Sequence, residues 1–219
     1  MGRVWAVSLG RVEIDLRAAW RSTAGDTPAA RAVGAELRAR WAEPHRRYHT
    51  TTHLTAVLAA VDELAADADD PDAVRLAAWF HDAVYDGIPG RDEERSAQLA
   101  TARLPRLGLP PHRVHTVARL VRLTAGHDPQ PGDADGAVLT DADLAVLGGT
   151  PEAYAAYANA IRAEYAHVPD AAFRTGRAAI LDRFLTAQAL FRTERGRTLW
   201  EARARTNIRK ELRRLRPTS

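Results

Sequence analysis

Residues 76–86 read LAAWFHDAVYD, so that an unbroken apolar run leads directly into His81 and Asp82. Burial of an imidazole and a carboxylate in apolar surroundings costs free energy unless a partner satisfies both groups. The stretch therefore requires that something close by satisfies both His81 and Asp82.

The sequence on both sides of this stretch has the apolar spacing of helices. Between Leu54 and Leu64, and again between Ile180 and Phe191, apolar residues recur at intervals of three and four, which places them on one helix face. No sustained alternation of the strand type is present. We predict one all-α domain over residues 1–219, with roughly eight to ten helices of the usual length of about 11 to 12 residues.

Proline and glycine predict where these helices begin and where the chain turns. Three helix starts are indicated by a Thr or Asp immediately before a Pro, because the side-chain oxygen can cap the helix and Pro fits its first position. They are Thr27–Pro28, Asp70–Pro71 and Thr150–Pro151. Breaks between helices are expected at residues 87–90, 105–111 and 126–136.

The composition excludes several classes of protein. With 46% hydrophobic and 27% charged residues in 219 positions, the chain is typical of globular proteins. It has no cysteine, which excludes disulfides and thiolate metal sites, and its only lysine is Lys210, which excludes a Walker A loop. We read no signal peptide and no membrane span, so we expect a cytoplasmic protein without a membrane partner.

Histidines are concentrated in residues 45–54, HRRYHTTTHL, where three of them follow at steps of four. The three threonines are poor residues for a helix interior, so we expect a helix to begin near 50–52 with His49 at its mouth. The spacing resembles the zincin helix, but Arg46 stands where that motif needs Glu, and we reject a metalloprotease. We favour an ordinary hydrogen-bonded role for His45 and a metal-ligand role for His53, which is followed by apolar residues.

A second acidic pair lies among apolar residues in VLTDADLAVLG, residues 138–148. We interpret Thr140–Asp141 as a helix N-cap, which leaves Asp143 in the first turn without a capping role. A mixed set of imidazoles and carboxylates, without thiols, suits a divalent ion that takes nitrogen and oxygen ligands. Such an ion would satisfy His81 and Asp82.

These residues carry a resemblance to a known family. His53, His81–Asp82 and Asp143 follow the H…HD…D order of the HD-domain phosphohydrolase superfamily, and the chain is similar to its branch of predicted metal-dependent HD phosphohydrolases. The similarity runs from about residue 40 to the C-terminus. The matching blocks are YHTTTHL, AAWFHDAVYD, DEERSA, LTDADLAVLG, YANAIRAEY, FRTGRAAIL and ARTNIRKEL.

The resemblance implies an HD-type helical bundle whose metal site is built from about residues 45–145, with the C-terminal helices packed on it. It implies a metal-dependent phosphohydrolase that acts on a nucleotide or another small phosphate ester. The divalent ion would be Mn, Fe, Co, Ni, Mg or Zn, and His49 would be a proton donor. The implied ligands are His53, His81, Asp82 and Asp143.

Four further residues are candidates for the site. Glu94 could orient the attacking water, and Arg95, His127 and Arg162 could bind the substrate, since a guanidinium fork binds two phosphate oxygens. For Glu94 and Arg95 an ion-paired, solvated helix face is an equal alternative, and for Arg162 simple surface exposure is favoured. His127 is either part of the site or an ordinary loop residue. The resemblance departs at Asp92, where the branch usually has Asn, and an added negative charge does not suit a phosphate site.

The C-terminal segment offers a different class of function. Between Arg195 and Arg216 nine basic residues face two glutamates, and such a helix could bind nucleic acid. We favour a solvated helix, because Trp200 is the only aromatic residue there, so nucleic acid is not the expected partner. A metal-bearing or nucleotide-binding sensor without turnover is the other alternative.

Overall fold

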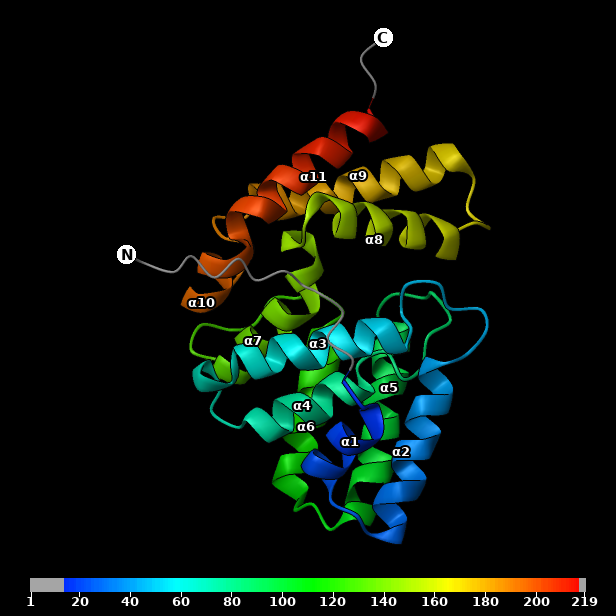
Figure 1. Ribbon diagram of the computed structural model, residues 1–219, viewed down its shortest axis with the longest axis vertical. Coiled ribbons are helices and arrows are strands. Elements are labelled where there is room, and N and C mark those ends of the chain that lie inside the picture. The colour runs from blue at the N-terminus through cyan, green and yellow to red at the C-terminus, as the bar shows by residue number, and fades with distance from the viewer. Residues whose placement is uncertain (1–13, 217–219) are drawn as a thin grey trace.

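The computed structural model describes residues 14–216, and within this range it is helical without any strand (Figure 1). The predicted all-α fold is confirmed. Ten α-helices have nine or more residues, and α10 is a single short turn. The helices are α1 (Leu16–Ala24), α2 (Pro28–Trp41), α3 (Thr51–Glu63), α4 (Pro71–Phe80), α5 (Arg91–Arg103), α6 (Pro111–Leu123), α7 (Ala134–Leu144), α8 (Pro151–Glu164), α9 (Asp170–Thr186), α10 (Glu194–Gly196) and α11 (Ala202–Leu215).

The three helix starts with Thr or Asp before Pro are confirmed at α2, α4 and α8. In each, the capping side chain accepts a hydrogen bond from the backbone N–H three residues later, and Pro occupies the start of the helix. The predicted N-cap at Thr140–Asp141 is wrong. Asp133 caps α7 by accepting from the Gly136 N–H at 3.0 Å, so Asp143 lies in the last turn of α7.

The helices form one buried core and one flanking layer. α3, α4, α6 and α7 pack around the centre, α1, α2 and α5 surround them, and α8, α9 and α11 lie together at one end of the molecule (Figure 1). Buried apolar side chains are contiguous from Trp20 in α1 to Ile208 in α11. The predicted breaks at 87–90 and 105–111 lie between α4 and α5 and between α5 and α6, apart from residue 111, which begins α6. The predicted break at 126–136 is too long, because α7 begins at residue 134. The first and third breaks border the site described below.

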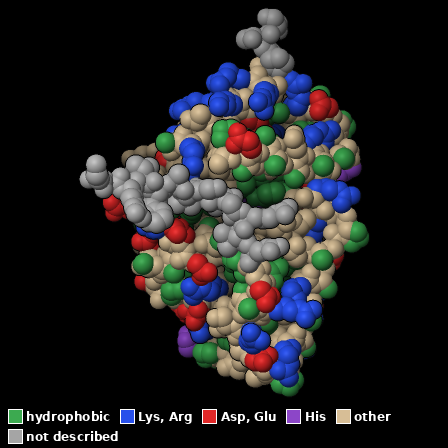
Figure 2. All heavy atoms as spheres, viewed as in Figure 1, with side chains coloured by type: hydrophobic (Ala, Val, Ile, Leu, Met, Phe, Trp, Pro, Cys, Tyr) green, Lys and Arg blue, Asp and Glu red, His purple; other side chains and the backbone are tan. Residues whose placement is uncertain are grey.

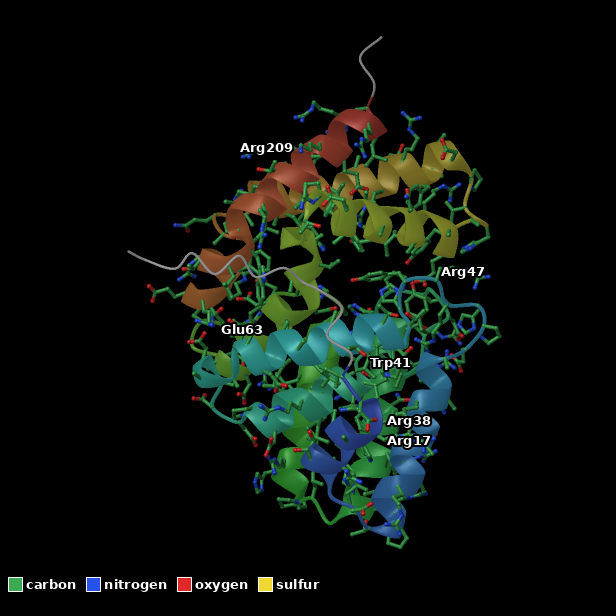
Figure 3. The ribbon with its side chains drawn as sticks, in the orientation of Figure 1. Arg17, Arg38, Trp41, Arg47, Glu63 and Arg209 are labelled. Carbon is green, nitrogen blue, oxygen red and sulfur yellow. The ribbon has the colours of Figure 1, made fainter. Side chains whose placement is uncertain are left out.

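A tryptophan pair connects the centre to α2. Trp41, at the end of α2, is fully buried and donates its indole N–H to the Trp79 carbonyl oxygen at 3.0 Å (Figure 3). Trp79 and Phe80, which precede His81, have no exposed surface. The apolar run of residues 76–80 is therefore the buried side of α4.

One face of the molecule carries a group of basic side chains where α9 and α11 lie (Figure 2). Lys and Arg side chains gather at this end of the molecule (Figure 2), and Arg209 lies on the outer side of α11 (Figure 3). No helix among residues 14–216 is long and apolar enough to cross a membrane. The N-terminal residues, in which we read no signal peptide, lie outside the described part of the chain.

Candidate metal centre and pocket

The start of α3 places two histidines one helical turn apart. Thr50 caps the helix by accepting from the Thr52 N–H at 3.3 Å, as the threonine run predicts. His49 precedes the cap and has a side chain that is 19% exposed, whereas His53 is buried in the first turns. His45 lies farther out and contacts the Tyr85 carbonyl oxygen at 2.8 Å, which fits the ordinary role that we favour for it.

His81 and Asp82 lie at the end of α4. His81 is the C-cap residue, and its Nδ1 lies 2.8 Å from the Ala78 carbonyl oxygen, which can only accept a hydrogen bond. Nδ1 therefore carries a proton, and in the neutral ring Nε2 presents a lone pair to the interior. Asp82 follows in the turn, with its side chain 14% exposed.

The third element is the last turn of α7, which carries Asp143. His127 holds one oxygen of this carboxylate, with its Nε2 2.7 Å from Asp143 Oδ2. The backbone of His127 has a φ of 54°, a left-handed conformation that non-glycine residues rarely adopt. The 124–133 loop therefore keeps an uncommon backbone conformation where its imidazole meets Asp143.

Four of these side chains converge, although they come from three separate segments. His53, His81 and Asp143 offer ligand atoms that all lie within 4.8 Å of one another. The Nε2 atoms of the two histidines are 3.3 Å apart, and Asp143 Oδ1 is 3.1 Å from His53 Nε2 and 3.6 Å from His81 Nε2. Asp82 Oδ2 lies 3.0 Å from His81 Nε2 and 3.8 Å from His53 Nε2. The structure therefore brings His53, His81 and Asp143 together and places Asp82 beside them, and these are the four residues that the HD resemblance names as candidate ligands.

The pKa shifts reflect this convergence of charges. Burial acts to lower the pKa of His81, but the Asp82 and Asp143 carboxylates outweigh it and raise that pKa well above its usual value. Burial prevails at His53, whose pKa is lowered. Burial would raise the pKa of Asp82, but the His81 and His49 imidazoles lower it to about 2, and the pKa of Asp143 also lies well below its usual value. Two anionic carboxylates thus share the interior with two histidines.

This donor set fits a divalent cation. At metal–ligand distances of about 2.0 to 2.2 Å, ligand atoms around one ion stand roughly 3 to 3.5 Å apart, which is close to the spacing found here. The lone pair of His81 Nε2 and the carboxylate oxygens repel one another unless a proton or a cation lies between them. The residues that could hold the ion are His53, His81, Asp82 and Asp143, and binding would displace protons from the imidazoles.

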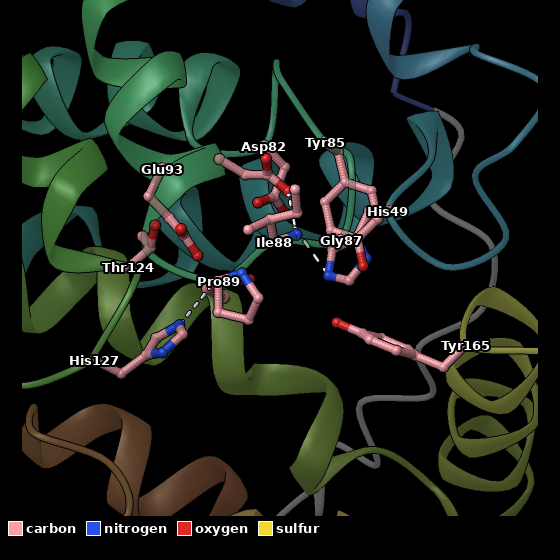
Figure 4. A pocket seen from close by; sticks show the side chains of 12 residues that line it. His49, Asp82, Tyr85, Gly87, Ile88, Pro89, Glu93, Thr124, His127 and Tyr165 are labelled. Atoms are coloured by element: carbon pink, nitrogen blue, oxygen red, sulfur yellow. Dashed lines mark hydrogen bonds and ion pairs between the residues drawn. The ribbon is translucent and has the colours of Figure 1, made fainter. Parts of the chain in front are cut away.

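A pocket opens above this cluster. It encloses about 130 Å³ and reaches from Asp82 and Asp143 to the rim formed by His49 and Tyr165 (Figure 4). The Tyr165 ring extends from the end of α8 toward His49. Its lining residues are His49, Asp82, Tyr85, Gly87, Ile88, Pro89, Asp92, Glu93, Thr124, His127, Asp143 and Tyr165.

Five of the predicted site residues do not line this pocket: the buried ligand candidates His53 and His81, and the three candidates Glu94, Arg95 and Arg162. Glu94 points outward from α5, where it pairs with Arg122 through two hydrogen bonds of 2.6 and 3.0 Å. Arg95 pairs with Asp86 at the surface. Arg162 donates to the carbonyl oxygens of Tyr165 and Val168 beyond the end of α8. Glu94 and Arg95 thus have the ion-paired role that we weighed against a function, whereas Arg162 is bound to backbone carbonyls and is only partly exposed.

Two buried residues around the site were missed by the sequence analysis. Arg46 has a fully buried side chain and donates to the His49 and Asp82 carbonyl oxygens at 3.1 and 2.7 Å, which ties the two ligand-bearing segments together. Glu164 contacts His49 Nδ1. The only sequence signal for Glu164 was its place in the block YANAIRAEY, from which we selected Arg162 instead.

Asp92 has a local structural role. Its Oδ2 accepts hydrogen bonds from the backbone N–H groups of Asp86 and Ile88 at 2.9 and 2.8 Å, which fixes the loop between α4 and α5. Its Oδ1 is buried without a hydrogen bond.

Comparisons of the chain with protein-family models, with curated proteins and with solved structures gave no match.

Proposed function

We propose that this protein is a metal-dependent phosphohydrolase of the HD type, which acts on a small phosphate ester through an activated water. The observation that carries the proposal is the convergence of His53, His81 and Asp143, with Asp82 beside His81 at 3.0 Å. Asp82 and Asp143 also line a pocket that a further histidine, His49, borders. The order of these residues along the chain is also the order that the HD resemblance requires. A divalent ion bound there would lower the pKa of its water and polarise a phosphoryl oxygen.

The residues of the chain supply the remaining steps. His49 Nε2 lies 3.9 Å from Asp82 Oδ2, so the ring faces the floor of the pocket and can give a proton to the leaving oxygen. Burial acts to lower the pKa of His49, but the Asp82 and Glu164 carboxylates raise it above its usual value, which favours the proton-bearing form. His127 keeps Asp143 in position, and the Thr124 hydroxyl group belongs to the same lining.

The charge and size of the pocket favour a single phosphate group. No arginine or lysine is among the residues that line it, whereas four carboxylates are. Triphosphates usually rely on guanidinium or ammonium groups in addition to metal, so extra phosphates would meet repulsion here. At about 130 Å³ the pocket is smaller than most ligand sites, which suits a phosphate with the rest of the ester outside. A nucleoside monophosphate or a small phosphomonoester is the substrate that we favour.

The decisive experiment measures bound metal and phosphate release together. Wild type is compared with single alanine variants at positions 53, 81, 82 and 143, after purification with Mn, Fe, Co, Ni, Mg or Zn. His115→Ala, on the exposed side of α6, is the matched control. We expect all four variants to lose stoichiometric metal and phosphate release while the control keeps both. Four variants that retain the metal would disprove the metal centre.

A second candidate function rests on α11. Arg209, Lys210, Arg213 and Arg214 are exposed there and make no ion pair within residues 14–216. Such a face can bind a nucleic-acid backbone. Affinity for RNA or DNA that falls steeply with salt, and that is lost when these four residues are changed to Gln, would favour this function. A metal-loaded protein that binds nucleotides without releasing phosphate would instead favour a sensor.

A further inference from the structure

Glu164 is a buried carboxylate in an unfavourable place on its own helix. It is the last residue of α8, where the helix dipole disfavours a negative charge. Its side chain is only 4% exposed. The partners that offset this cost belong to a distant segment, because Glu164 reaches the residues before α3, more than 110 positions earlier in the chain.

One oxygen of Glu164 holds the backbone of that segment. Oε2 accepts hydrogen bonds from three consecutive N–H groups, those of Arg47, Tyr48 and His49, at 2.6, 2.7 and 3.2 Å. Successive backbone N–H groups that surround an anion form a strong local binding site. The backbone at residues 47–49 is therefore fixed relative to the end of α8.

The other oxygen determines the state of the His49 ring. Oε1 contacts Nδ1 of His49. An ionised carboxylate can only accept, so Nδ1 carries a proton and Nε2 is the nitrogen that exchanges its proton with the pocket. Tyr85 stacks on the same ring, with centroids 4.2 Å apart and planes at 28°, which limits its rotation. The ring thereby keeps Nε2 on the side of Asp82.

We propose that Glu164 is the positioning residue for His49: it selects the Nδ1–H form of the imidazole and aims Nε2 at the pocket. The inference rests on the proposed function, because it assumes that His49 donates a proton. In that step the oxygen of the attacking water forms a bond to phosphorus, the P–O bond to the leaving group breaks, and Nε2 gives its proton to the leaving oxygen. The water loses a proton to solvent, and solvent returns a proton to the ring afterwards. The Nδ1 proton stays on the ring throughout, where it is donated to Glu164. The Glu164 carboxylate also balances the positive charge of the doubly protonated ring before the transfer.

Glu164→Gln separates this role from a purely structural one. The Gln oxygen can still accept from the three backbone N–H groups, so the loop keeps its anchor. The Gln amide then donates to Nδ1, which forces the neutral ring into the Nε2–H form. Glu152→Gln, in the exposed first turn of the same helix, is the matched control.

The first measurement does not depend on activity. In the full-length protein, nitrogen-15 spectra of the histidine side chains at alkaline pH report which ring nitrogen carries the proton, with His49 assigned by the signal lost in His49→Ala. We expect the Nδ1–H form in wild type and in Glu152→Gln, and the Nε2–H form in Glu164→Gln. An Nε2–H ring in wild type, or a ring that does not change form in Glu164→Gln, would overturn the proposal.

The second measurement asks whether the orientation matters for turnover. A ring held in the wrong form costs up to about 10⁴-fold in related proton-transfer sites, and we expect kcat to fall at least about 10²-fold with KM little changed. His49→Ala and the double variant should then be equally slow, because the two residues act as one unit. An unchanged kcat in Glu164→Gln would overturn the positioning role. If wild type cleaves no phosphate ester, the proposed function fails, and the spectra alone decide whether Glu164 orients His49.

Discussion

Two aspartates that stand two residues apart on α7 are satisfied in opposite ways. Asp141 has no exposed surface, and its carboxylate accepts from the Arg192 N–H at 2.6 Å and from the Thr193 N–H and hydroxyl, both at 2.8 Å. Asp143 instead meets three imidazoles and opens onto the pocket. One carboxylate is closed in by fixed neutral donors, and the other is surrounded by groups that can lose a proton.

The pKa values of the two carboxylates diverge for this reason. Burial raises the pKa of Asp141, even though backbone and hydroxyl donors act against it. At Asp143 burial acts in the same direction, but the imidazoles, His81 foremost, hold the pKa well below its usual value. A buried aspartate thus marks a ligand site only when its partners can be exchanged for a cation, and the apolar neighbours in the sequence are the same in both cases.

The largest expected effect is that of replacing Asp143, the aspartate that lines the pocket. Asp143→Ala removes an anionic ligand and should abolish metal binding. The rate of phosphate release should then fall by about 10³-fold or more, since the ion supplies several kcal/mol of transition-state stabilisation. Elemental analysis and phosphate release measure the two losses. Retention of the metal would place Asp143 in the same structural class as Asp141.

His49→Ala should spare the metal but not the turnover. His49 lies at the rim, and its Nε2 is 3.9 Å from Asp82 Oδ2. The substitution therefore leaves the four proposed ligand side chains in place. Loss of a general acid typically slows a reaction by about 10² to 10⁴-fold. The same two assays decide the result. Loss of the metal in this variant would mean that His49 is itself a ligand and that its role has been exchanged with that of His53.

Asp141→Ala should act on stability instead of metal. It leaves two buried donors at Thr193 and a part-buried one at Arg192 without an acceptor, and each unpaired buried donor costs about 1 to 3 kcal/mol. We expect a loss of at least about 3 kcal/mol in the free energy of unfolding, measured with urea, and loss of the contact between α7 and the segment before α10. Asp67→Ala, at an exposed site after α3, is the control. A variant as stable as wild type would remove the distinction between the two aspartates.

The boundary of α7 shows where sequence reasoning ends. The spacing of apolar residues predicted helices, and the HD resemblance named the residues that converge in the structure, because both follow from local pattern and chain order. The N-cap at Thr140–Asp141 was wrong because the Gly- and Asp-rich residues before it were interpreted as loop, although Asp133 caps a helix that runs through them. The donors to Asp141 come from residues about 50 positions later, which no local pattern can indicate.

Helix register limited the prediction of the site in a similar way. Glu93 lines the pocket and Glu94 does not, although they are adjacent. Neighbouring residues on a helix point about 100° apart, so the outcome depends on where the loop before α5 ends. Glu164 was missed for a different reason, because its partners lie more than 110 residues away in the sequence.

The pH dependence of stability tests the role of Glu164, whose carboxylate accepts hydrogen bonds mainly from backbone N–H groups. Burial acts to raise its pKa, but His49 and the N–H groups hold it well below the usual value near 4.5. A depressed pKa contributes stability that is present above the unfolded-state value and is lost as the pH falls below it. The melting temperature of wild type should therefore drop more between pH 6 and 3 than that of Glu164→Gln. Glu194→Gln, exposed on α10, should follow wild type, and equal slopes in all three would contradict the assigned role.

Asp92, on α5, is intermediate between Asp141 and Asp143 in how its carboxylate is satisfied, and its substitution gives the smallest expected effect. One of its oxygens accepts two backbone N–H groups, as at Asp141, while the other is buried without a hydrogen bond and has Arg95 Nη1 only at 3.8 Å. Asp92→Asn keeps the accepting oxygen and removes a poorly compensated buried charge, so it should be at least as stable as wild type, by up to about 1 kcal/mol. It should also lower KM for a phosphomonoester, because one negative charge leaves the pocket lining.

Asp92→Ala, which removes the acceptor for the backbone N–H groups of Asp86 and Ile88, should instead lower the free energy of unfolding by about 1 to 3 kcal/mol. If the Asn variant were as unstable as the Ala variant, the charge of Asp92 would itself be stabilising, and a positively charged partner for its free oxygen would have to exist in the pocket.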